Sequence, residues 1–329
     1  MSRPSIPARS VRKVLESING RVAVVGSANA DICTRTFELP RPGETVVGSS
    51  IVVRPGGKSA NQAVQAALLG ANVSFVTAVG RDSNAGVVTN SLRGAGVSLA
   101  HVEAVDLPTG TALITVDDAG ENTIVVSAGA NGRANEAFVE GHASAIADAA
   151  VVGLCLEIPL DGVLNTAVIA KAHGTQVLLN LSPFMAVPPE LIAAADVLVV
   201  NETELSDLLG SAVDVDGLAG DHFVQERVAV KLAILGVHRA IVTLGGKGAL
   251  VLDGHLATVV PAVEVQPVDT TGCGDAFFGT VLAALASGAT LFEACQLAVV
   301  VAGFAAEGEG AQQSYGSRDK VLRPVGRHR

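Results

Sequence analysis

The chain has 329 residues, of which 49% are hydrophobic and only 16% are charged, so it can build a large core in one or two domains. The formal net charge of −10 argues against nucleic acid as a partner, because a phosphate backbone is bound by a basic surface. No apolar run reaches the roughly 18 residues of a membrane span, and the scattered cysteines argue against structural zinc and a disulfide framework.

The amino-terminal stretch carries four basic residues within its first 13 positions but no apolar segment, so it does not resemble a secretory signal. We interpret residues 1–20 as an N-terminal extension, 21–320 as the folded domain and 321–329 as a C-terminal tail. Together with the absence of an apolar span, this predicts a cytoplasmic protein that does not contact membranes.

The predicted strands are of two kinds. Val22–Val25 is a short, wholly apolar run, which predicts a buried strand. Four later segments alternate and are rich in β-branched residues, which predicts half-exposed antiparallel strands, the last two joined as a hairpin. These four segments are Thr34–Leu39, Thr45–Val53, Ala112–Val116 and Asn122–Ser127.

Elsewhere, apolar strands alternate with helical stretches, which predicts an α/β fold with a mostly parallel sheet covered on both faces. The antiparallel segments, inserted at about 30–55 and 110–128, would form a small sheet that acts as a lid over the ligand-binding edge. The other strands are expected at Val73–Val79, Ala150–Leu156, Gln176–Leu179, Asp196–Val200, Ala240–Thr243 and Ala249–Leu252. Helices are expected at Ala60–Leu69, Gly86–Gly94 and Leu160–His173, and two more after Asp275.

A glycine-rich loop leads into the first of these helices. Its Gly-Gly-Lys-Ser sequence suggests a P-loop, but that motif requires glycine where Val52 stands. What remains is a flexible turn followed by Lys58 and Asn61, two hydrogen-bond donors suited to a polyhydroxylated ligand. Both residue types are also common as solvated surface groups.

Polar residues follow other predicted strands at their carboxyl ends. Asn29 and Asp31 share one face if the segment is extended, and they could accept sugar hydroxyls or form an Asx turn. Glu157 could be a ligand contact or a loop residue. Asn201 and Glu204 have the spacing of an N-cap with a capping box, although Glu204 could also orient water around Mg²⁺.

The turn Thr243–Gly248 is rich in glycine and is a weak signal for a nucleotide close to the backbone. The sequence contains no Gly-x-Ser-x-Gly elbow, and no Gly-x-Gly-x-x-Gly follows the first strand. A serine hydrolase and a dinucleotide-dependent dehydrogenase are therefore disfavoured.

The segment Gly272-Cys273-Gly274-Asp275 precedes a strongly apolar predicted helix. Its glycines allow a tight turn, and the helix start supplies unpaired N–H groups that attract an anion. An aspartate there is ordinarily a cap. Beside an anion-binding turn, however, a carboxylate is useful if it takes a proton from a hydroxyl that attacks a phosphoryl group. Asp275 is therefore the candidate general base.

These motifs, in this order from residue 22 to 314, resemble the ribokinase-like (PfkB) family of sugar kinases. The segment Gly56–Ala63 is similar to the amino-terminal signature of the family, and Asp269–Asp275 is similar to its highly specific carboxyl-terminal signature. Five shorter segments resemble the ribokinases within the family in particular. These are Asn29–Asp31, Pro42–Thr45, Ser127–Asn131, Asn201–Glu204 and Gly310–Gln312.

The resemblance implies a doubly wound α/β/α core with a small β-sheet lid, which often forms a homodimer contact. It also implies ATP-dependent phosphorylation of a sugar hydroxymethyl group, with D-ribose converted to ribose 5-phosphate as the expected reaction. The base would be Asp275, and the backbone N–H groups of Gly272, Cys273 and Gly274 would form the anion hole. The sugar would contact Asn29, Asp31, Gly57, Lys58, Asn61 and Glu157.

The same resemblance implies a set of nucleotide and cation contacts. ATP would contact Asn201, Thr243, Gly245, Gly248 and Gly274, and Glu204 would hold Mg²⁺ through water. An activating monovalent cation, usually K⁺, would be bound by Asp269, Thr271, Ala305, Gly310 and Ser314.

The sequence departs from the family pattern at three positions. Ser59 stands where a third glycine is usual, Val299 stands at an often polar position near the adenine site, and Gln313 replaces a frequent proline. The first departure leaves the sugar open, with fructose, deoxyribose and 2-keto-3-deoxygluconate as the alternatives within the family. A non-catalytic sugar or nucleotide sensor on the same fold is the alternative from another class.

Overall fold

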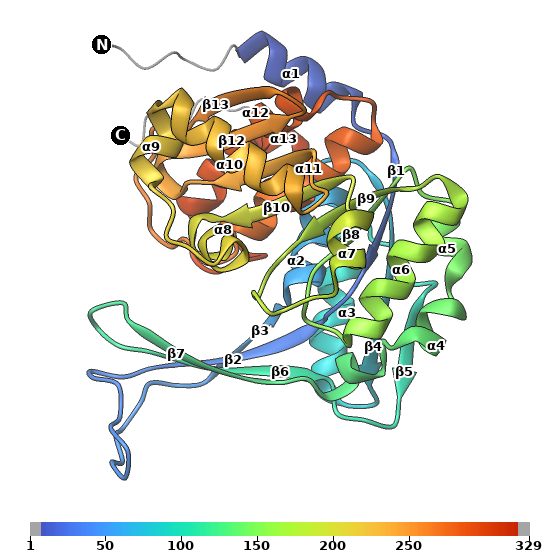
Figure 1. The fold of residues 1–329 in the computed structure, drawn as a ribbon. Coiled ribbons are helices and arrows are strands. Elements are labelled where there is room, and N and C mark those ends of the chain that lie inside the picture. The colour runs from blue at the N-terminus through green and yellow to red at the C-terminus, as the bar shows by residue number, and fades with distance from the viewer. Residues whose placement is uncertain (1–7, 322–329) are drawn as a thin grey trace.

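The computed structural model describes residues 8–321 (Figure 1). Its main sheet has nine strands in the order β13-β12-β11-β10-β9-β8-β1-β4-β5. Their bounds are β1 Arg21–Val25, β4 Asn72–Gly80, β5 Val102–Val105, β8 Val151–Leu154, β9 Gln176–Asn180, β10 Val197–Asn201, β11 Arg239–Thr243, β12 Gly248–Asp253 and β13 Leu256–Pro261.

The sheet is parallel from β11 through β1 to β5 and antiparallel at the β11–β12 and β12–β13 pairs. The chain winds outward from β1 in both directions, which confirms the predicted doubly wound, mostly parallel sheet. We expected a strand near 249–252, but not that it reverses direction. The segments that became β5 and β13 were not predicted as strands, because their short alternating patterns are weak signals.

Helices cover both faces of the main sheet. One face carries α1 Ala8–Ser17, α2 Lys58–Leu68, α3 Ser83–Ala95, α11 Cys273–Ala286, α12 Leu291–Ala306 and α13 Arg318–Val321. The other carries α4 Glu136–Glu140, α5 Ala143–Ala147, α6 Leu160–His173, α7 Pro189–Ala194, α8 Glu202–Leu209, α9 Val215–Gly220 and α10 His222–Ile234. Short 3₁₀ turns, η1 Gly129–Arg133 and η2 Gly245–Lys247, complete the connections.

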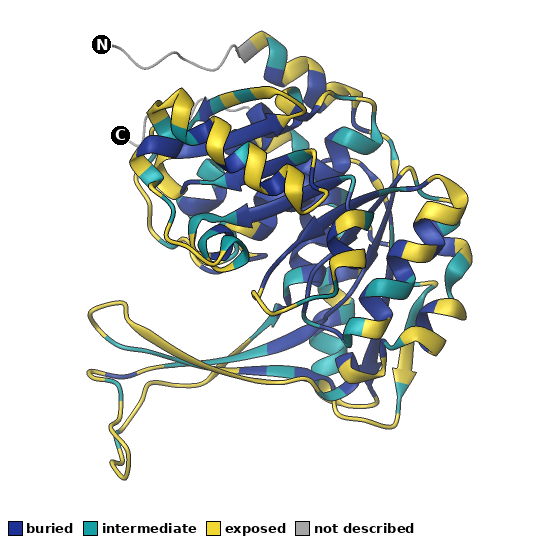
Figure 2. Ribbon diagram, in the orientation of Figure 1, coloured by how far each residue is buried: buried dark blue, intermediate teal, exposed yellow. Residues whose placement is uncertain are grey.

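The strand β1 shows how the two cores form. Val22 and Val24 pack into the core under α2 and α11, whereas Ala23 and Val25 pack into the core on the other face. Because successive side chains point to opposite faces, a wholly apolar run is needed where both faces are covered. The apolar run that predicted a buried strand is therefore explained by burial on both sides (Figure 2).

A second sheet projects from the main one as a lid (Figure 1). It has four strands in the order β3-β2-β6-β7, with β2 Asn29–Arg35, β3 Val52–Gly56, β6 Gly110–Val116 and β7 Asn122–Ser127. The β2–β3 and β6–β7 pairs are antiparallel as expected, and β2 and β6 join in parallel.

The predicted bounds of the first lid pair are wrong, because residues 37–51 contain no strand. Pro40 and Pro42 lack the N–H that a ladder requires, so pairing stops before this segment and resumes at Val52.

Within residues 8–321, no helix is both long and apolar enough to cross a membrane.

Candidate functional site

The site residues collect at the carboxyl ends of the central strands, where α2 and α11 begin. Gly279 lets these two helices approach closely, since a Cβ there would lie 2.4 Å from the carbonyl oxygen of Gln62. Asp275 lies one helical turn before Gly279. The close crossing therefore brings the first turn of α2 against the Asp275 carboxylate.

Asp275 lies at the third position of α11, after Gly272 as the N-cap, and is 7% exposed. It is not the capping residue. Its Oδ2 accepts a hydrogen bond from Asn61 Nδ2 at 2.9 Å, and its Oδ1 accepts one from Gln62 Nε2 at 3.2 Å. Gln312 Nε2 in turn donates to Asn61 Oδ1 at 2.9 Å. The carboxylate is thus held by two amides of α2, and the loop after α12 in turn holds one of them.

The electrostatics of this carboxylate follow from its burial. Burial raises the pKa of Asp275, while Lys58 and the two amides oppose the rise. For Lys58, burial lowers the pKa, but the carboxylates of Asp275 and Glu157 outweigh it and leave that pKa above its usual value. A protonated Lys58 beside Asp275 suits a base that must be both ionised and able to take a proton.

Hydrogen bonds fix two of the predicted sugar residues, Asn29 and Glu157, in place. Asn29 is 3% exposed and its Oδ1 accepts a hydrogen bond from Asn131 Nδ2 at 2.7 Å. Glu157 accepts from the Lys58 N–H at 3.0 Å with the same oxygen that accepts from Ser27 Oγ. Glu157 therefore fixes the start of α2.

Two features shape the loop that carries these residues. Gly57 has φ +88°, and a Cβ there would lie 2.9 Å from the backbone nitrogen of Asn29, so only glycine fits without a shift. The Asp31 carboxylate packs directly against Gly56, since a Cβ added to Gly56 would lie 2.0 Å from Oδ2 of Asp31. Burial, together with the charges of Glu157 and Asp275, raises the pKa of Asp31 to about 7.

The turn before α11 has the backbone geometry of an anion site. Gly272 has φ +75°, and Tyr315 donates its hydroxyl to the Gly272 carbonyl at 2.8 Å. The N–H groups of Gly272 and Gly274 make no hydrogen bond within the described chain, whereas the Cys273 N–H donates to the Thr270 carbonyl at 3.2 Å. Two of the three predicted donors are therefore free for a ligand.

The predicted monovalent-cation residues lie on two adjoining loops and in the last turn of α12. The Asp269 carboxylate accepts N–H groups from Thr271 and Gly310, each at 2.9 Å. Ser314 donates its hydroxyl to the Ala311 carbonyl at 2.8 Å, and the Ala305 carbonyl accepts the Gly308 N–H at 3.1 Å. Loops far apart in sequence thus meet at Asp269.

The predicted nucleotide residues lie at the ends of β10 and β11. Asn201 and Glu204 form a capping box, at 2.8 and 2.9 Å, which is the structural role their spacing indicated. Asn201 pairs in register with Thr243, and Gly245 begins the following turn. Packing alone explains why residue 248 is glycine, since a Cβ there would lie 2.0 Å from the Val260 carbonyl oxygen.

Two of the departures from the family pattern are buried. Ser59 is 0% exposed, and its Oγ lies 3.0 Å from the Cys155 sulfur in the space that Gly26 leaves. Val299 lies in α12, is 6% exposed and packs into the hydrophobic core on that face of the sheet. The third, Gln313, lies exposed beside Gly310.

Several residues that complete the site were not predicted from the sequence. Gln62 and Gln312 orient the Asp275 network, Asn131 holds Asn29, and Arg54 lines the adjacent cavity. Gln62, Gln312 and Asn131 lie inside the motifs Gly56–Ala63, Gly310–Gln312 and Ser127–Asn131, so membership of a motif could have identified them. No such signal marks Arg54.

Known proteins of similar sequence and structure share this architecture. Residues 19–318 match the model of the pfkB family of carbohydrate kinases. The chain is 35% identical over 306 residues to a ribokinase of Haemophilus influenzae, covering 92% of this chain and 97% of that protein. It is also 35% identical over 298 residues to a deoxyribokinase of Salmonella typhi, covering 90% and 95%.

Among solved structures, the ribokinase of Arabidopsis thaliana complexed with ribose and ATP has a TM-score of 0.85 and 32% identity. It matches 92% of this chain and 98% of its own. The ribokinase of Thermotoga maritima has a TM-score of 0.82 and 31% identity, covering 92% and 98%.

Proposed function

The chain belongs to the pfkB family of carbohydrate kinases, and we propose that it phosphorylates the 5-hydroxyl of D-ribose with ATP to give ribose 5-phosphate. The observation that carries the proposal is the buried Asp275 carboxylate, oriented by Asn61 and Gln62 beside the free N–H groups of Gly272 and Gly274. Relatives named ribokinase, one of them solved with ribose and ATP, support ribose as the acceptor.

In this proposal, Asp275 takes the proton from the sugar hydroxymethyl group as its oxygen attacks the phosphoryl group. Gly272, Cys273 and Gly274 stabilise the charge that develops on the phosphoryl oxygens, once the Cys273 N–H is shared with or released from Thr270. Asn29, Asp31, Gly57, Lys58, Asn61 and Glu157 hold the sugar.

ATP would lie along the ends of β10 and β11, at Asn201, Thr243, Gly245 and Gly248, with Gly274 at its terminal phosphate. Glu204 suits a Mg²⁺ ion that comes with the nucleotide, because Mg²⁺ keeps most of its waters and takes one or two carboxylates plus phosphate oxygens. When bound, Mg²⁺ would neutralise phosphate charge.

The loops at Asp269 fit a monovalent cation such as K⁺ in their chemistry, since they offer one carboxylate, one hydroxyl and several carbonyls. Asp269, Thr271, Ala305, Gly310 and Ser314 would hold it. Such a cation would add positive charge behind the anion hole, and K⁺-stimulated turnover would support this assignment.

The outer face of the lid supports a homodimer. Val53, Ile32, Leu113 and Val125 are aligned in register across all four lid strands, and all except Ile32 are more than 40% exposed. An exposed apolar row of this kind marks an interface. We infer a homodimer through the lid, and a cytoplasmic enzyme because its second substrate is ATP.

We also infer that residues 21–320 form one kinase domain, which the family match over 19–318 supports. A second acceptor, 2-deoxyribose, is favoured by the deoxyribokinase relative, whose identity equals that of the ribokinase.

The test is ADP release from MgATP over a panel of pentoses, hexoses and nucleosides, with and without K⁺. Turnover on ribose well above every other sugar supports the proposal. Preference for 2-deoxyribose or a hexose would mean that the chain is a kinase of the same family with a different sugar acceptor. Sugar binding without any turnover would instead identify a sensor.

A further inference from the structure

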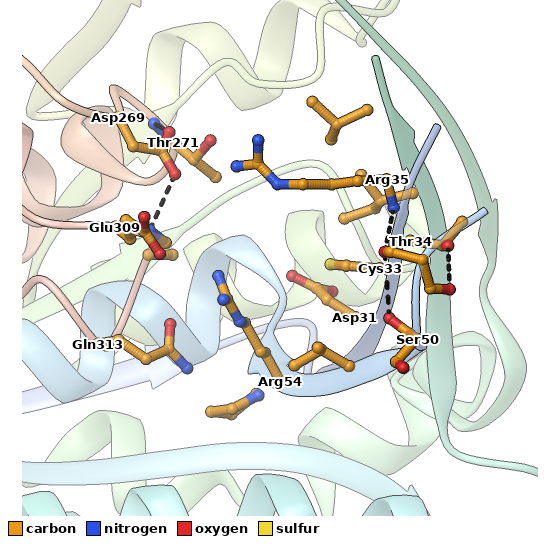
Figure 3. Close-up of a pocket in the computed structure, with 17 residues that line it drawn as sticks. Asp31, Cys33, Thr34, Arg35, Ser50, Arg54, Asp269, Thr271, Glu309 and Gln313 are labelled. Atoms are coloured by element: carbon orange, nitrogen blue, oxygen red, sulfur yellow. Dashed lines mark hydrogen bonds between the residues drawn. The ribbon is translucent and has the colours of Figure 1, made fainter. Parts of the chain in front are cut away.

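A cavity of about 290 Å³ lies between the underside of the lid and the core loops (Figure 3). Its lid wall includes Asp31, Cys33, Arg35 and Arg54, and its core wall includes residues 269, 271, 309–311 and 313. The cavity therefore connects the proposed sugar contact Asp31 with Thr271, the residue directly before the anion-binding turn.

Strand register places two arginines on this underside. Asp31, Cys33 and Arg35 alternate along β2, and Asp31 pairs with Arg54 on β3, so all four share the face that lines the cavity. In Figure 3, the side chains of Arg35 and Arg54 extend from the lid toward the loops that carry Asp269 and Glu309.

Neither guanidinium has an anionic partner in the part of the chain that the structure describes. Among residues 8–321, neither arginine forms an ion pair or donates a side-chain hydrogen bond to another residue. Arg54 is partly buried, and a desolvated cation without a partner is costly. An unpaired guanidinium that faces an open cavity is suited to bind an oxyanion from outside the chain.

Three carboxylates also line the cavity, and none neutralises Arg54 directly. Asp269 is engaged by the N–H groups of Thr271 and Gly310, and Asp31 lies against Gly56. Glu309 is exposed. The side chain of Arg54 extends to the Gly310 loop. Its Nη1 would lie 2.9 Å from a Cβ added to Gly310.

We propose that Arg54, with Arg35 further along the same strand face, forms an oxyanion subsite beneath the lid that binds a phosphate group. The proposal rests on the proposed kinase function. The phosphate is either that of the phosphosugar product or the terminal phosphate of the nucleotide, because both lie near the turn at Gly272 during transfer. The flat, forked guanidinium matches two phosphate oxygens at once.

The variant Arg54→Gln removes the charge and keeps a polar side chain. Arg54→Lys keeps the charge without the fork, and Arg41→Gln is the matched control, because Arg41 lies in an exposed lid segment outside the cavity lining. Calorimetric titration of each protein with inorganic phosphate, ribose, ribose 5-phosphate, ADP and ATP measures binding without requiring turnover. Thermal melts show whether each variant is folded.

We expect Arg54→Gln to weaken inorganic phosphate binding about tenfold, with ribose affinity changed less than twofold, Arg54→Lys intermediate and Arg41→Gln as wild type. A parallel loss for ribose 5-phosphate identifies the product as the source, and a loss for ATP but not ADP identifies the nucleotide.

Unchanged phosphate, ribose 5-phosphate and ATP affinities in folded Arg54→Gln would overturn the subsite. An equal loss for neutral ribose would do the same, because Arg54 would then shape the sugar site as a whole. If wild-type protein bound no ribose, the proposed acceptor would fail, yet the inorganic phosphate titration would still test the subsite.

Discussion

The side-chain nitrogen of Asn61 lies 2.9 Å from Oδ2 of Asp275, and its side-chain oxygen accepts a hydrogen bond from Gln312. One amide thus connects the first turn of α2, the third residue of α11 and the loop after α12. Because an amide donates with one end and accepts with the other, Gln312 fixes which way Asn61 points. The candidate base is oriented by tertiary contacts rather than by its own helix.

Replacing Asp275 with Asn tests its assignment as the base. The amide keeps the shape of the side chain but cannot take a proton, so kcat should fall by about 10²–10⁴. Sugar affinity should stay within a few-fold. Steady-state kinetics and calorimetric sugar binding check this, and turnover near the wild-type rate would mean that another group is the base.

Replacing Gln312 with Ala tests the orienting network. It removes the donor to Asn61, so Asn61 can turn and Asp275 loses its fixed direction; kcat should fall about tenfold while the sugar KM changes less. Asn61→Ala should lower kcat and also raise the sugar KM, because Asn61 is itself a proposed sugar contact.

The double variant Asn61→Ala/Gln312→Ala provides the check on this network. Since the two residues act on Asp275 as one unit, the double variant should cost little more than Asn61→Ala alone. Fully additive losses in kcat would show that the two side chains act independently.

Asp31 should make sugar binding depend on pH. Its pKa of about 7 means that the carboxylate, the better acceptor for sugar hydroxyls, is lost as the pH falls through neutrality. We therefore expect the sugar KM to rise between pH 8 and pH 6. In Asp31→Asn, the KM should be higher than in wild type and flat over this range.

The same group should affect stability with the opposite sign. The folded state keeps a proton on Asp31 between about pH 4 and pH 7 that the unfolded chain releases, so the free energy of unfolding falls as the pH rises through this window. Asp31→Asn should therefore raise the melting temperature at pH 8, with the gain shrinking toward pH 4. If the melting temperature did not rise at pH 8, the ionised Asp31 carboxylate would not destabilise the folded state.

Gly272 should not tolerate a side chain. Its φ of +75° is unfavourable for alanine, and the added Cβ would lie 2.6 Å from the Cβ of Ala311. Gly272→Ala should cost roughly 1–3 kcal/mol of stability, measured by denaturant unfolding. Gly246→Ala is the control, because no atom lies within 4 Å of its added Cβ and its φ is not positive; equal losses would refute the strain argument.

Ser59 should affect stability more than sugar choice. Its hydroxyl is buried against the Cys155 sulfur. Ser59→Gly should lower stability by about 0.5–1 kcal/mol and leave the preference among sugars within about threefold. A change of preferred sugar in the panel would restore Ser59 as a specificity residue.

Local signals in the sequence determined much of the fold. The wholly apolar runs that became β1 and β8 predicted strands buried on both faces, and their alternation with helical stretches predicted the doubly wound sheet. The Gly272–Asp275 turn and the Asn201–Glu204 capping box were readable because they depend on neighbours within four residues. Periodicity and capping are local, so a sequence can show them.

Only the tertiary structure decided which distant side chains meet. Nothing local indicates that Gln312 bonds to Asn61, that Asn131 holds Asn29, or that Arg54 lines a cavity beside Asp269. The reversal at β12 and the parallel join of β2 to β6 are likewise set by pairing between strands. Apart from the β11–β12 hairpin, these contacts join residues 81 to 251 positions apart. Such pairings depend on packing that no single segment encodes.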